Sequence, residues 1–310
     1  MKFKSLIISL LLIFVGMQVF SQEEEESLLD LLGEDEEVIN YAQASFKTTL
    51  VVNLASIENT HAGVLDFKIM HRFGYLNTGF YEFFGLDQAT TRLALIYGIT
   101  DRVEVGIGRS TLNKNWDGFT KWRILWQSTG AKIMPLSLSF FANVSYRSIR
   151  YPEDDIRTIY PSSNFYYTFQ FLLARKFSER FTLQLVPSLV HRNLIDTPEE
   201  KNDVFSLGLS GRIKLSKRIA LNFEYFYSFP DQLASEYVNP LSIGIDIETG
   251  GHVFQLLFTN ATGMVPDAVI TETTGNWTQG DIRFGFNISR VFTIVDMNKR
   301  KVEKEKKKDV

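Results

Sequence analysis

The stretch ATTRLALIYGITDRVEVGIGR, residues 89–109, decides the fold of this chain. Apolar side chains such as Leu93 and Leu95 recur at every second position, and charged ones such as Arg92 and Glu104 occupy positions that alternate with them. Period-two alternation is typical of strands with two unlike faces, and the short Thr-Asp turn between the halves indicates an antiparallel hairpin. A soluble sandwich would bury the apolar face, whereas a membrane barrel turns it to lipid and keeps the charges in its lumen.

The same alternation recurs along the rest of the chain and predicts twelve strands, most of them near the ten residues that a tilted spanning strand needs. Their cores are expected at 64–73, 89–98, 102–109, 119–127, 136–147, 165–176, 181–191, 204–215, 219–228, 241–248, 252–259 and 280–292.

The connections between these runs also alternate in length, which favours the barrel. Short ones are expected at 100–101, 178–180, 216–218 and 249–251, with a somewhat longer one at 128–135, and long ones at 74–88, 110–118, 148–164, 193–203, 229–240 and 261–279. Short periplasmic turns and longer outer loops are the pattern of a transmembrane antiparallel up-and-down β-barrel. With about twelve strands, both termini are predicted to be periplasmic. The alternative fold is a soluble periplasmic β-sandwich.

The beginning of the chain reads as an export signal. Lys2 and Lys4 precede an apolar run of signal-peptide length, so we expect residues 1–21 to be removed after Ser21. The alternative is an N-terminal anchor, for which the apolar run is short. The expected localisation is the cell outer membrane, with outer-membrane lipid as a partner.

Composition excludes several classes of function. The chain has no cysteine, which rules out disulfides and thiolate metal sites, and its formal charge of −3 predicts no nucleic-acid partner. Aromatic residues make up 14% of the chain, a high share that suits a barrel. No cofactor motif is present, so no cofactor is expected.

Two charged segments flank the predicted barrel, residues 64–292. Residues 22–63 begin with an acidic stretch, nine of fifteen residues between Glu23 and Glu37, and are expected to be periplasmic. The part at 46–54 alternates poorly and is interpreted as a non-spanning strand, a plug element or a periplasmic pairing. The basic tail at 293–310 is expected to be periplasmic and solvated. Either terminus could contact a periplasmic protein partner.

The inward face of the predicted strands carries ten basic and six acidic candidates for lining the lumen. They are Asp66, Lys68, Arg72, Arg92, Arg102, Glu104, Lys121, Arg123, Arg147, Arg212, Lys214, Glu224, Asp246, Glu248, Asp281 and Arg283. One interpretation is a network of ion pairs that fills a narrow barrel. The other is a polar passage whose basic excess favours anionic or zwitterionic solutes, because rings of Arg and Lys select anions.

Catalytic and metal-binding patterns are not found. The four histidines are not paired at metal-ligand spacing. His71 falls on the outward face of its strand, where a neighbouring Ser or Asn could build a lipid hydrolase on the barrel wall. An interfacial His is the simpler interpretation, and we expect no enzyme. Gly106 and Gly108 are read as room in the barrel wall rather than as a phosphate loop.

Three runs of the chain together resemble a known family. The sequences VLDFKIMHRFG, FYEFFGLDQATTRLALIYGITDRVEVGIGRS and DGFTKWRILWQ are similar to those of a Bacteroidota outer-membrane β-barrel family of unknown function. The resemblance covers most of the chain after the signal. It implies an exported barrel and brings no substrate or catalytic residue.

The expected function is a narrow channel or transporter for small polar or anionic solutes. Twelve strands lie between the eight that side chains fill and the sixteen or more that leave an open pore, so an open and a plugged lumen are both compatible with the count. If the surplus bases are hydrated, the barrel is a channel. If residues 40–63 fold inside and match these bases, the barrel is closed. A structural barrel or a subunit of an envelope complex is the alternative. The sequence does not fix the oligomeric state.

Overall fold

The computed structural model describes residues 38–152, 155 and 157–297. The predicted signal peptide, the acidic stretch to Glu37 and most of the basic tail lie outside these residues. From Ile39 onward the chain forms one compact unit. Within the described residues no helix is both long and apolar enough to cross a bilayer.

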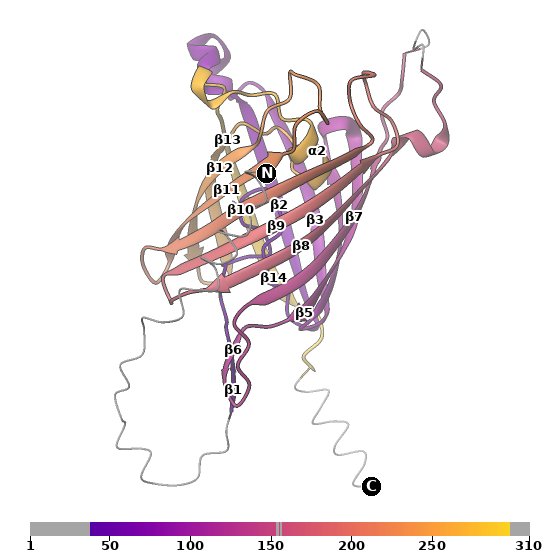
Figure 1. Ribbon diagram of the computed structural model, residues 1–310. Helices are drawn as coiled ribbons and strands as arrows, with labels where there is room; N and C mark the ends of the chain where they lie inside the picture. The colour runs from indigo at the N-terminus through magenta and orange to yellow at the C-terminus, as the bar shows by residue number, and fades with distance from the viewer. Residues whose placement is uncertain (1–37, 153–154, 156, 298–310) are drawn as a thin grey trace, which may run out of the picture. The chain divides into compact units, whose positions relative to one another are not determined.

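Twelve strands close into one antiparallel barrel, in which β14 pairs with β2 (Figure 1). They are β2 (Val64–Tyr75), β3 (Ala89–Thr100), β4 (Val103–Ser110), β5 (Asn115–Leu125), β7 (Ser137–Arg147), β8 (Phe165–Lys176), β9 (Phe181–Arg192), β10 (Asp203–Lys214), β11 (Ile219–Ser228), β12 (Leu241–Thr249), β13 (His252–Thr259) and β14 (Arg283–Thr293). The predicted fold class is confirmed, because each of the twelve alternating runs is a strand of this barrel.

One strand departs clearly from its predicted bounds. β5 begins at Asn115 and ends at Leu125, whereas the run was expected at 119–127. Its first inward side chains are Asn115 and Asp117, both polar and buried. Asn115, Asp117 and Gly118 are residue types that favour turns, so this end of the strand reads as loop in the sequence.

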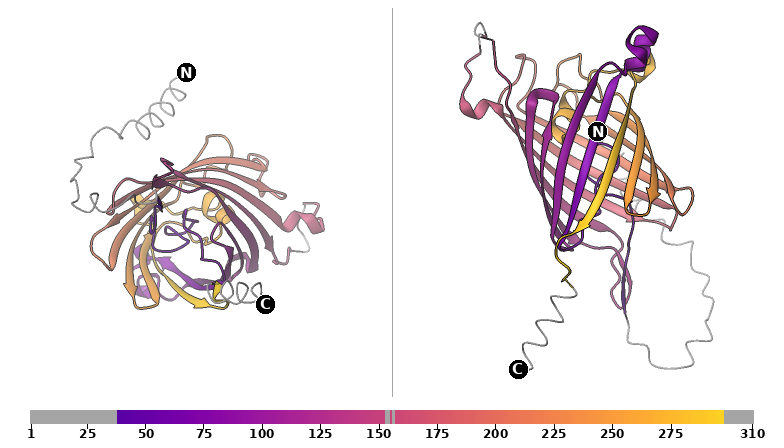
Figure 2. Two further views of the ribbon diagram at one scale, coloured as in Figure 1. Left: turned by 90° about the horizontal axis from the view of Figure 1, so that it is seen from below. Right: turned by 180° about the vertical axis from the view of Figure 1, so that it is seen from behind.

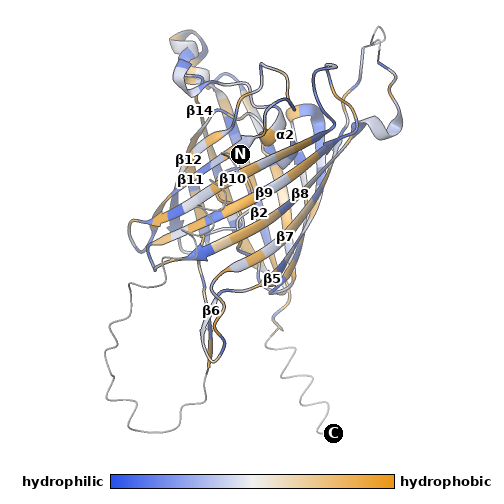
Figure 3. Ribbon diagram, in the orientation of Figure 1, coloured by the Kyte–Doolittle hydropathy of each residue, from blue (hydrophilic) through white to orange (hydrophobic). Residues whose placement is uncertain are grey.

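The strands place their apolar residues outside and their charges inside. Leu95 and Ile107 are 44% and 55% exposed on the outer surface, while Arg92 and Glu104 are 5% and 1% exposed. Figure 3 shows hydrophobic and hydrophilic residues alternating along the strands.

The two ends of the barrel differ, and we call them the turn end and the loop end (Figure 1). At the turn end β6 (Ser128–Gly130), in the connection between β5 and β7, pairs with β1 (Ile39–Tyr41). The loop end carries α2 (Pro266–Thr271) and the 3-10 helices η2 (Leu76–Gly85), η3 (Leu112–Lys114), η4 (Pro161–Asn164) and η5 (Trp277–Gln279). All six residues of α2 are buried.

Residues 44–62, which we call the plug segment, lie inside the ring of strands (Figure 2, left). The segment follows β1 and leads into β2. It turns back on itself at its tip, where Leu50 bridges Ala55 and the Val51 N–H donates to the Leu54 carbonyl at 2.9 Å. The tip is fully buried, so the plug segment belongs to the barrel's core rather than to its surface.

Candidate functional site

The lumen is the candidate site, and most of the predicted lining residues point into it. Eleven of them are at least nine-tenths buried: Asp66, Lys68, Arg72, Arg92, Glu104, Lys121, Arg123, Arg147, Arg212, Glu224 and Asp246.

The other five lie at the ends of strands. Arg102 is an exposed turn residue whose guanidinium donates to the Ile124 carbonyl at 3.3 Å, and Asp281 precedes β14 in a loop. Lys214 and Arg283 are terminal strand residues, and Glu248 is a half-buried rim residue of β12. Arg102 and Asp281 therefore do not line the lumen, because the alternation was extended past the strand ends.

The wall charges form short ion pairs. Lys121 Nζ lies 2.9 Å from Glu104, and Lys68 Nζ lies 2.9 Å from Asp66. Pairs of this kind meet the requirement that a buried charge have a partner.

Sequence reasoning missed the partner of Arg92. Asp117 lies in the stretch read as loop, and it accepts two hydrogen bonds from the Arg92 guanidinium, at 2.9 and 2.5 Å. A Cβ atom on Gly108 would lie 2.6 Å from both groups, so glycine at this position leaves the space that the pair occupies. The predicted room in the barrel wall thus holds an ion pair.

Glu224 of β11 holds the tip of the plug segment. Its buried carboxylate accepts the backbone N–H groups of Val52 at 3.4 Å, Asn53 at 3.3 Å and Leu54 at 3.1 Å. The Arg72 guanidinium donates to the Asn53 side-chain oxygen at 2.9 Å. Wall groups of both charges therefore bind the same tip.

Wall bases also donate to backbone carbonyls of the plug segment. Lys121 donates to the Ser56 carbonyl at 2.9 Å, Arg123 to Ile57 at 3.0 Å and Arg212 to Ala44 at 3.0 Å. Uncharged wall amides do the same: Gln184 donates to Ala55, Gln255 to Val51 and Asn287 to Val52. Peptide oxygens thus take the place of water at donors that the wall acids do not fully satisfy.

The other side of the plug segment is apolar. Phe46, Val52, Leu54 and Ile57 are at most 2% exposed and belong to one hydrophobic cluster with wall residues. The wall contributes Phe141, Leu172, Ala174, Val186, Val190, Val204, Phe226 and Leu257. This mixture of polar and apolar contacts explains why the segment shows no alternation in sequence.

The loop end is closed by the connection that carries α2. Asp267, which is fully buried, accepts a hydrogen bond from Arg147 at 3.0 Å and one from Ser145 at 2.7 Å. Arg147 also pairs with Glu272, and its guanidinium lies 3.7 Å from the centre of the Tyr166 ring. Burial raises the pKa of the Glu272 carboxyl. Asp267 and Glu272 were expected in an outer loop, and no pattern in the sequence predicts their contact with Arg147.

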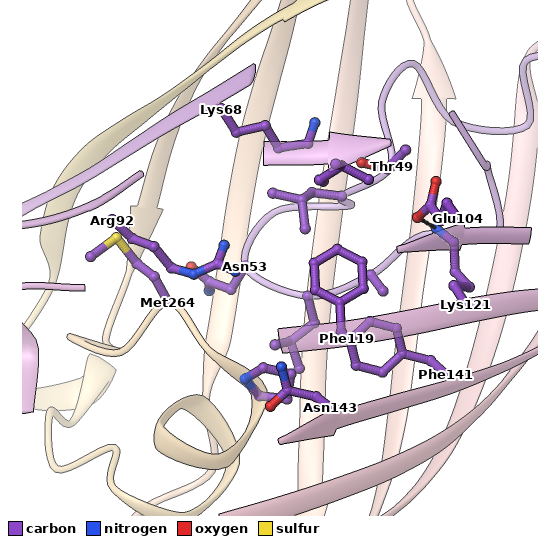
Figure 4. Close-up of a pocket in the computed structure, with 15 residues that line it drawn as sticks. Thr49, Asn53, Lys68, Arg92, Glu104, Phe119, Lys121, Phe141, Asn143 and Met264 are labelled. Carbon is purple, nitrogen blue, oxygen red and sulfur yellow. Dashed lines mark ion pairs between the residues drawn. The ribbon is translucent and has the colours of Figure 1, made fainter. Parts of the chain in front are cut away.

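Between the plug segment and this loop only a small gap remains (Figure 4). It measures about 30 Å³ and is lined by Asn53, Phe119 and Asn143 together with Met264 and Pro266 of the loop. A space of this size accommodates about one or two water molecules. The plug segment and the connection that carries α2 therefore fill this part of the lumen.

His71, the histidine considered for a site on the barrel wall, lies outside the lumen. His71 Nδ1 lies 2.9 Å from Thr91 Oγ1, and the ring stacks on Phe286 on the outer face of the barrel. In the described part of the chain, no group of three or more His, Asp or Glu side chains is placed to hold a metal ion.

Comparison with known proteins identifies a family. Residues 46–292 match the profile of a family described as "Membrane bound beta barrel domain (DUF5777)". A search of curated proteins found no significant sequence match.

Among solved structures, the KdgM porin is 8% identical, with 74% of this chain and 99% of that chain covered and a TM-score of 0.46. The NanC porin is also 8% identical, with 74% and 100% covered and a TM-score of 0.46. An active-site mutant of the outer membrane phospholipase A from Escherichia coli is 9% identical, with 75% and 91% covered and a TM-score of 0.43. Similarities of this size give no information about ligand or activity.

Proposed function

Because the chain belongs to the family of membrane-bound β-barrel domains, we propose that it is an outer-membrane channel for small polar or anionic solutes. In its resting state the channel is closed, and the plug segment is its gate.

The observation that supports this proposal is how the lumen is filled. An eight-stranded barrel can be filled by the side chains of its own wall. Here wall side chains such as Glu224 and Lys121 form hydrogen bonds with the backbone of the plug segment. Such a segment can leave without breaking any pairing between the strands of the barrel, and its departure exposes both the polar groups and the apolar cluster of the wall.

The preference for anions follows from the wall charges that stay behind when the plug segment leaves. The buried bases on the strands are Lys68, Arg72, Arg92, Lys121, Arg123, Arg147, Arg192 and Arg212. The buried acids are Asp66, Glu104, Asp117, Glu224 and Asp246 of the strands together with Glu200 and Asp267 of the loops, which pair with Arg192 and Arg147, so the excess is one base. A basic excess at close quarters selects anions in pores.

Planar-bilayer conductance tests the proposal. The mature protein is compared with a variant that lacks residues 22–60, after heat-modifiable migration has shown that both are folded. We expect the truncated protein to conduct with anion preference and the mature protein to be mostly silent. If both folded proteins are silent, the barrel is structural or part of an envelope complex.

We also propose that the barrel is not a hydrolase. Serine-directed activity probes on the purified protein in detergent are expected to leave it unlabelled, and covalent labelling would contradict this.

We also propose that the turn end faces the periplasm. A tag inserted at Asp155 or Asn276, both at the loop end, should be accessible on intact cells, and a tag at the C-terminus should not. The opposite labelling pattern would reverse the orientation.

A further inference from the structure

The lumen wall has an apolar arc on strands β7 to β10. Phe141 of β7, Leu172 of β8, Val190 of β9 and Val204 of β10 are buried and belong to one cluster with the apolar side of the plug segment. Within these four strands, the buried charged side chains lie at or within two residues of a strand end: Arg147, Arg192 and Arg212. The middle of this arc is therefore uncharged.

Most of the buried charges lie across the lumen from this arc. Arg72 is on β2 and Arg92 on β3, which lie half of the twelve-strand ring away from β9 and β10. Lys121 and Arg123 are on β5, in the same charged part of the wall. Without the plug segment, the lumen would thus be amphipathic across its width.

Three wall bases depend on the plug segment for a partner. The other buried bases of the strands pair with acids, whereas in the described part of the chain Arg72, Arg123 and Arg212 form no ion pair with a wall carboxylate. Each of the three donates to an oxygen of the plug segment, at 2.9 to 3.0 Å. Two strand acids without an ion pair, Glu224 and Asp246, stand against them, so one base remains in excess when the segment leaves.

The plug segment shows which chemistry satisfies such a wall. Its Val52 and Leu54 side chains pack in the apolar cluster, while oxygens of the same segment accept hydrogen bonds from the bases. A hydrophilic anion would satisfy the bases and leave the apolar arc against water. A neutral apolar molecule would cover the arc and leave the bases without an acceptor.

We propose that the solute of this lumen is an amphipathic organic anion, with a carboxylate, sulfonate or similar acid group on an alkyl or aryl body. The acid group binds the bases that the plug segment releases, and the apolar body lies along the arc of β7 to β10. This inference rests on the channel proposed above and narrows its solutes. Because the anion and the plug segment use the same wall groups, each excludes the other, and the solute favours the open state.

Hydrogen exchange of the plug tip tests the proposal on the mature protein in lipid nanodiscs. Hexane-1-sulfonate carries both parts of the expected ligand, isethionate carries the charge without the apolar body, and 1-hexanol carries the apolar body without the charge. We expect hexane-1-sulfonate to speed exchange of residues 50–56 in proportion to its concentration, severalfold more than either of the other probes, because it binds only the undocked state. Exchange of residues 103–110 on β4 should not change.

Three results would overturn the proposal. Equal acceleration by isethionate would identify a hydrophilic anion site, and equal acceleration by 1-hexanol would identify an apolar one. No acceleration by hexane-1-sulfonate would show that it does not compete with the plug segment. Acceleration that extends to residues 103–110 would show general destabilisation of the barrel and would count as no acceleration.

Matched variants test the two parts of the site, each compared with its own exchange rate without ligand. Val190→Thr puts a hydroxyl into the apolar arc and should reduce the hexane-1-sulfonate effect severalfold, whereas Val105→Thr makes the same change on the outer surface and should not. Arg123→Gln removes one of the released bases and should also reduce the effect, unlike Arg102→Gln at an exposed turn. A wild-type response in either lumen variant would refute the part of the site that it removes.

The exchange experiment does not depend on conductance. Displacement of the tip by hexane-1-sulfonate in a barrel that never conducts would support the lumen site and remove the channel. Conductance of the truncated barrel, without displacement of the tip in the intact protein, would support the channel and overturn this class of solute.

Discussion

Replacing Glu224 by glutamine should release the tip of the plug segment. The carboxylate binds three backbone N–H groups, with Oε1 accepting from Asn53 and Oε2 accepting from Val52 and Leu54. Glutamine keeps one oxygen and puts an NH₂ donor in place of the other. At least one N–H group therefore loses its acceptor, and the remaining bonds lose the negative charge that strengthens them.

The size of the effect follows from these bonds. A buried donor left unsatisfied costs about 1–3 kcal/mol, and a hydrogen bond to a charged group is worth about 1 kcal/mol more than a neutral one. The Glu224→Gln change should weaken docking of the tip by about 2–5 kcal/mol. Because about 1.4 kcal/mol is a factor of ten, the population of the undocked tip should rise about 30- to 3,000-fold.

Hydrogen exchange measures this population directly. Peptides that cover residues 50–56 should exchange faster in Glu224→Gln by the same factor, provided that opening is fast and reversible. Asp117→Asn is the control, since it removes another buried lumen charge, one that accepts from the wall residue Arg92 and not from the plug segment. Exchange within about threefold of wild type in Glu224→Gln, or an equal effect of Asp117→Asn, would refute the assignment of Glu224 as the group that holds the tip.

Three further predictions concern the barrel wall and the loop end. Gly108→Ala places a methyl group against the buried Arg92–Asp117 ion pair. The change should destabilise the barrel by about 1–3 kcal/mol and lower its melting temperature. Gly250→Ala is the control, because its methyl group would point into open space and should have no effect. Arg147→Gln removes the cation that faces fully buried Asp267, which should destabilise docking of the α2 connection by about 3–5 kcal/mol. Limited proteolysis should therefore cut residues 260–275 sooner than in the wild type. Unchanged cleavage would contradict the pairing. Burial raises the pKa of Glu272, which means that the docked loop binds this proton more tightly than the undocked loop. Docking should therefore be strongest below the usual pKa of glutamate and weaken as the pH rises through the raised pKa. Hydrogen exchange of residues 260–275, measured across that pH range, tests this expectation.

The barrel could be predicted from sequence because each strand has two environments. A residue on β3 or β4 faces either the outer surface or the lumen, and period-two alternation records that choice at every position. The start of β5 was misplaced where both inward residues, Asn115 and Asp117, are polar. Trp116 faces outward there, but it stands alone among Asn115, Asp117 and Gly118, which are turn-forming residue types, so no repeat marks the strand.

The plug segment and the buried loop residue Asp267 could not be predicted in the same way. Residues 44–62 have no repeating face, because apolar wall and polar donors surround them on different sides. The order of the residues therefore carries no period that identifies an internal segment. Likewise, Asp267 is an ordinary loop aspartate in the sequence, and only the fold brings it to Arg147.

Both ends of the plug segment are tied to the barrel at the turn end, one through β1 and β6 and the other through its continuation into β2. The segment is thus an intramolecular ligand, and a short tether gives such a ligand an effective concentration of about 1 mM. A sequence that would bind the empty lumen as a free peptide with a dissociation constant of about 10 μM would be seated about 99% of the time. Tight closure thus requires only modest intrinsic affinity, and a signal that weakens this affinity about a hundredfold would leave the lumen empty half of the time.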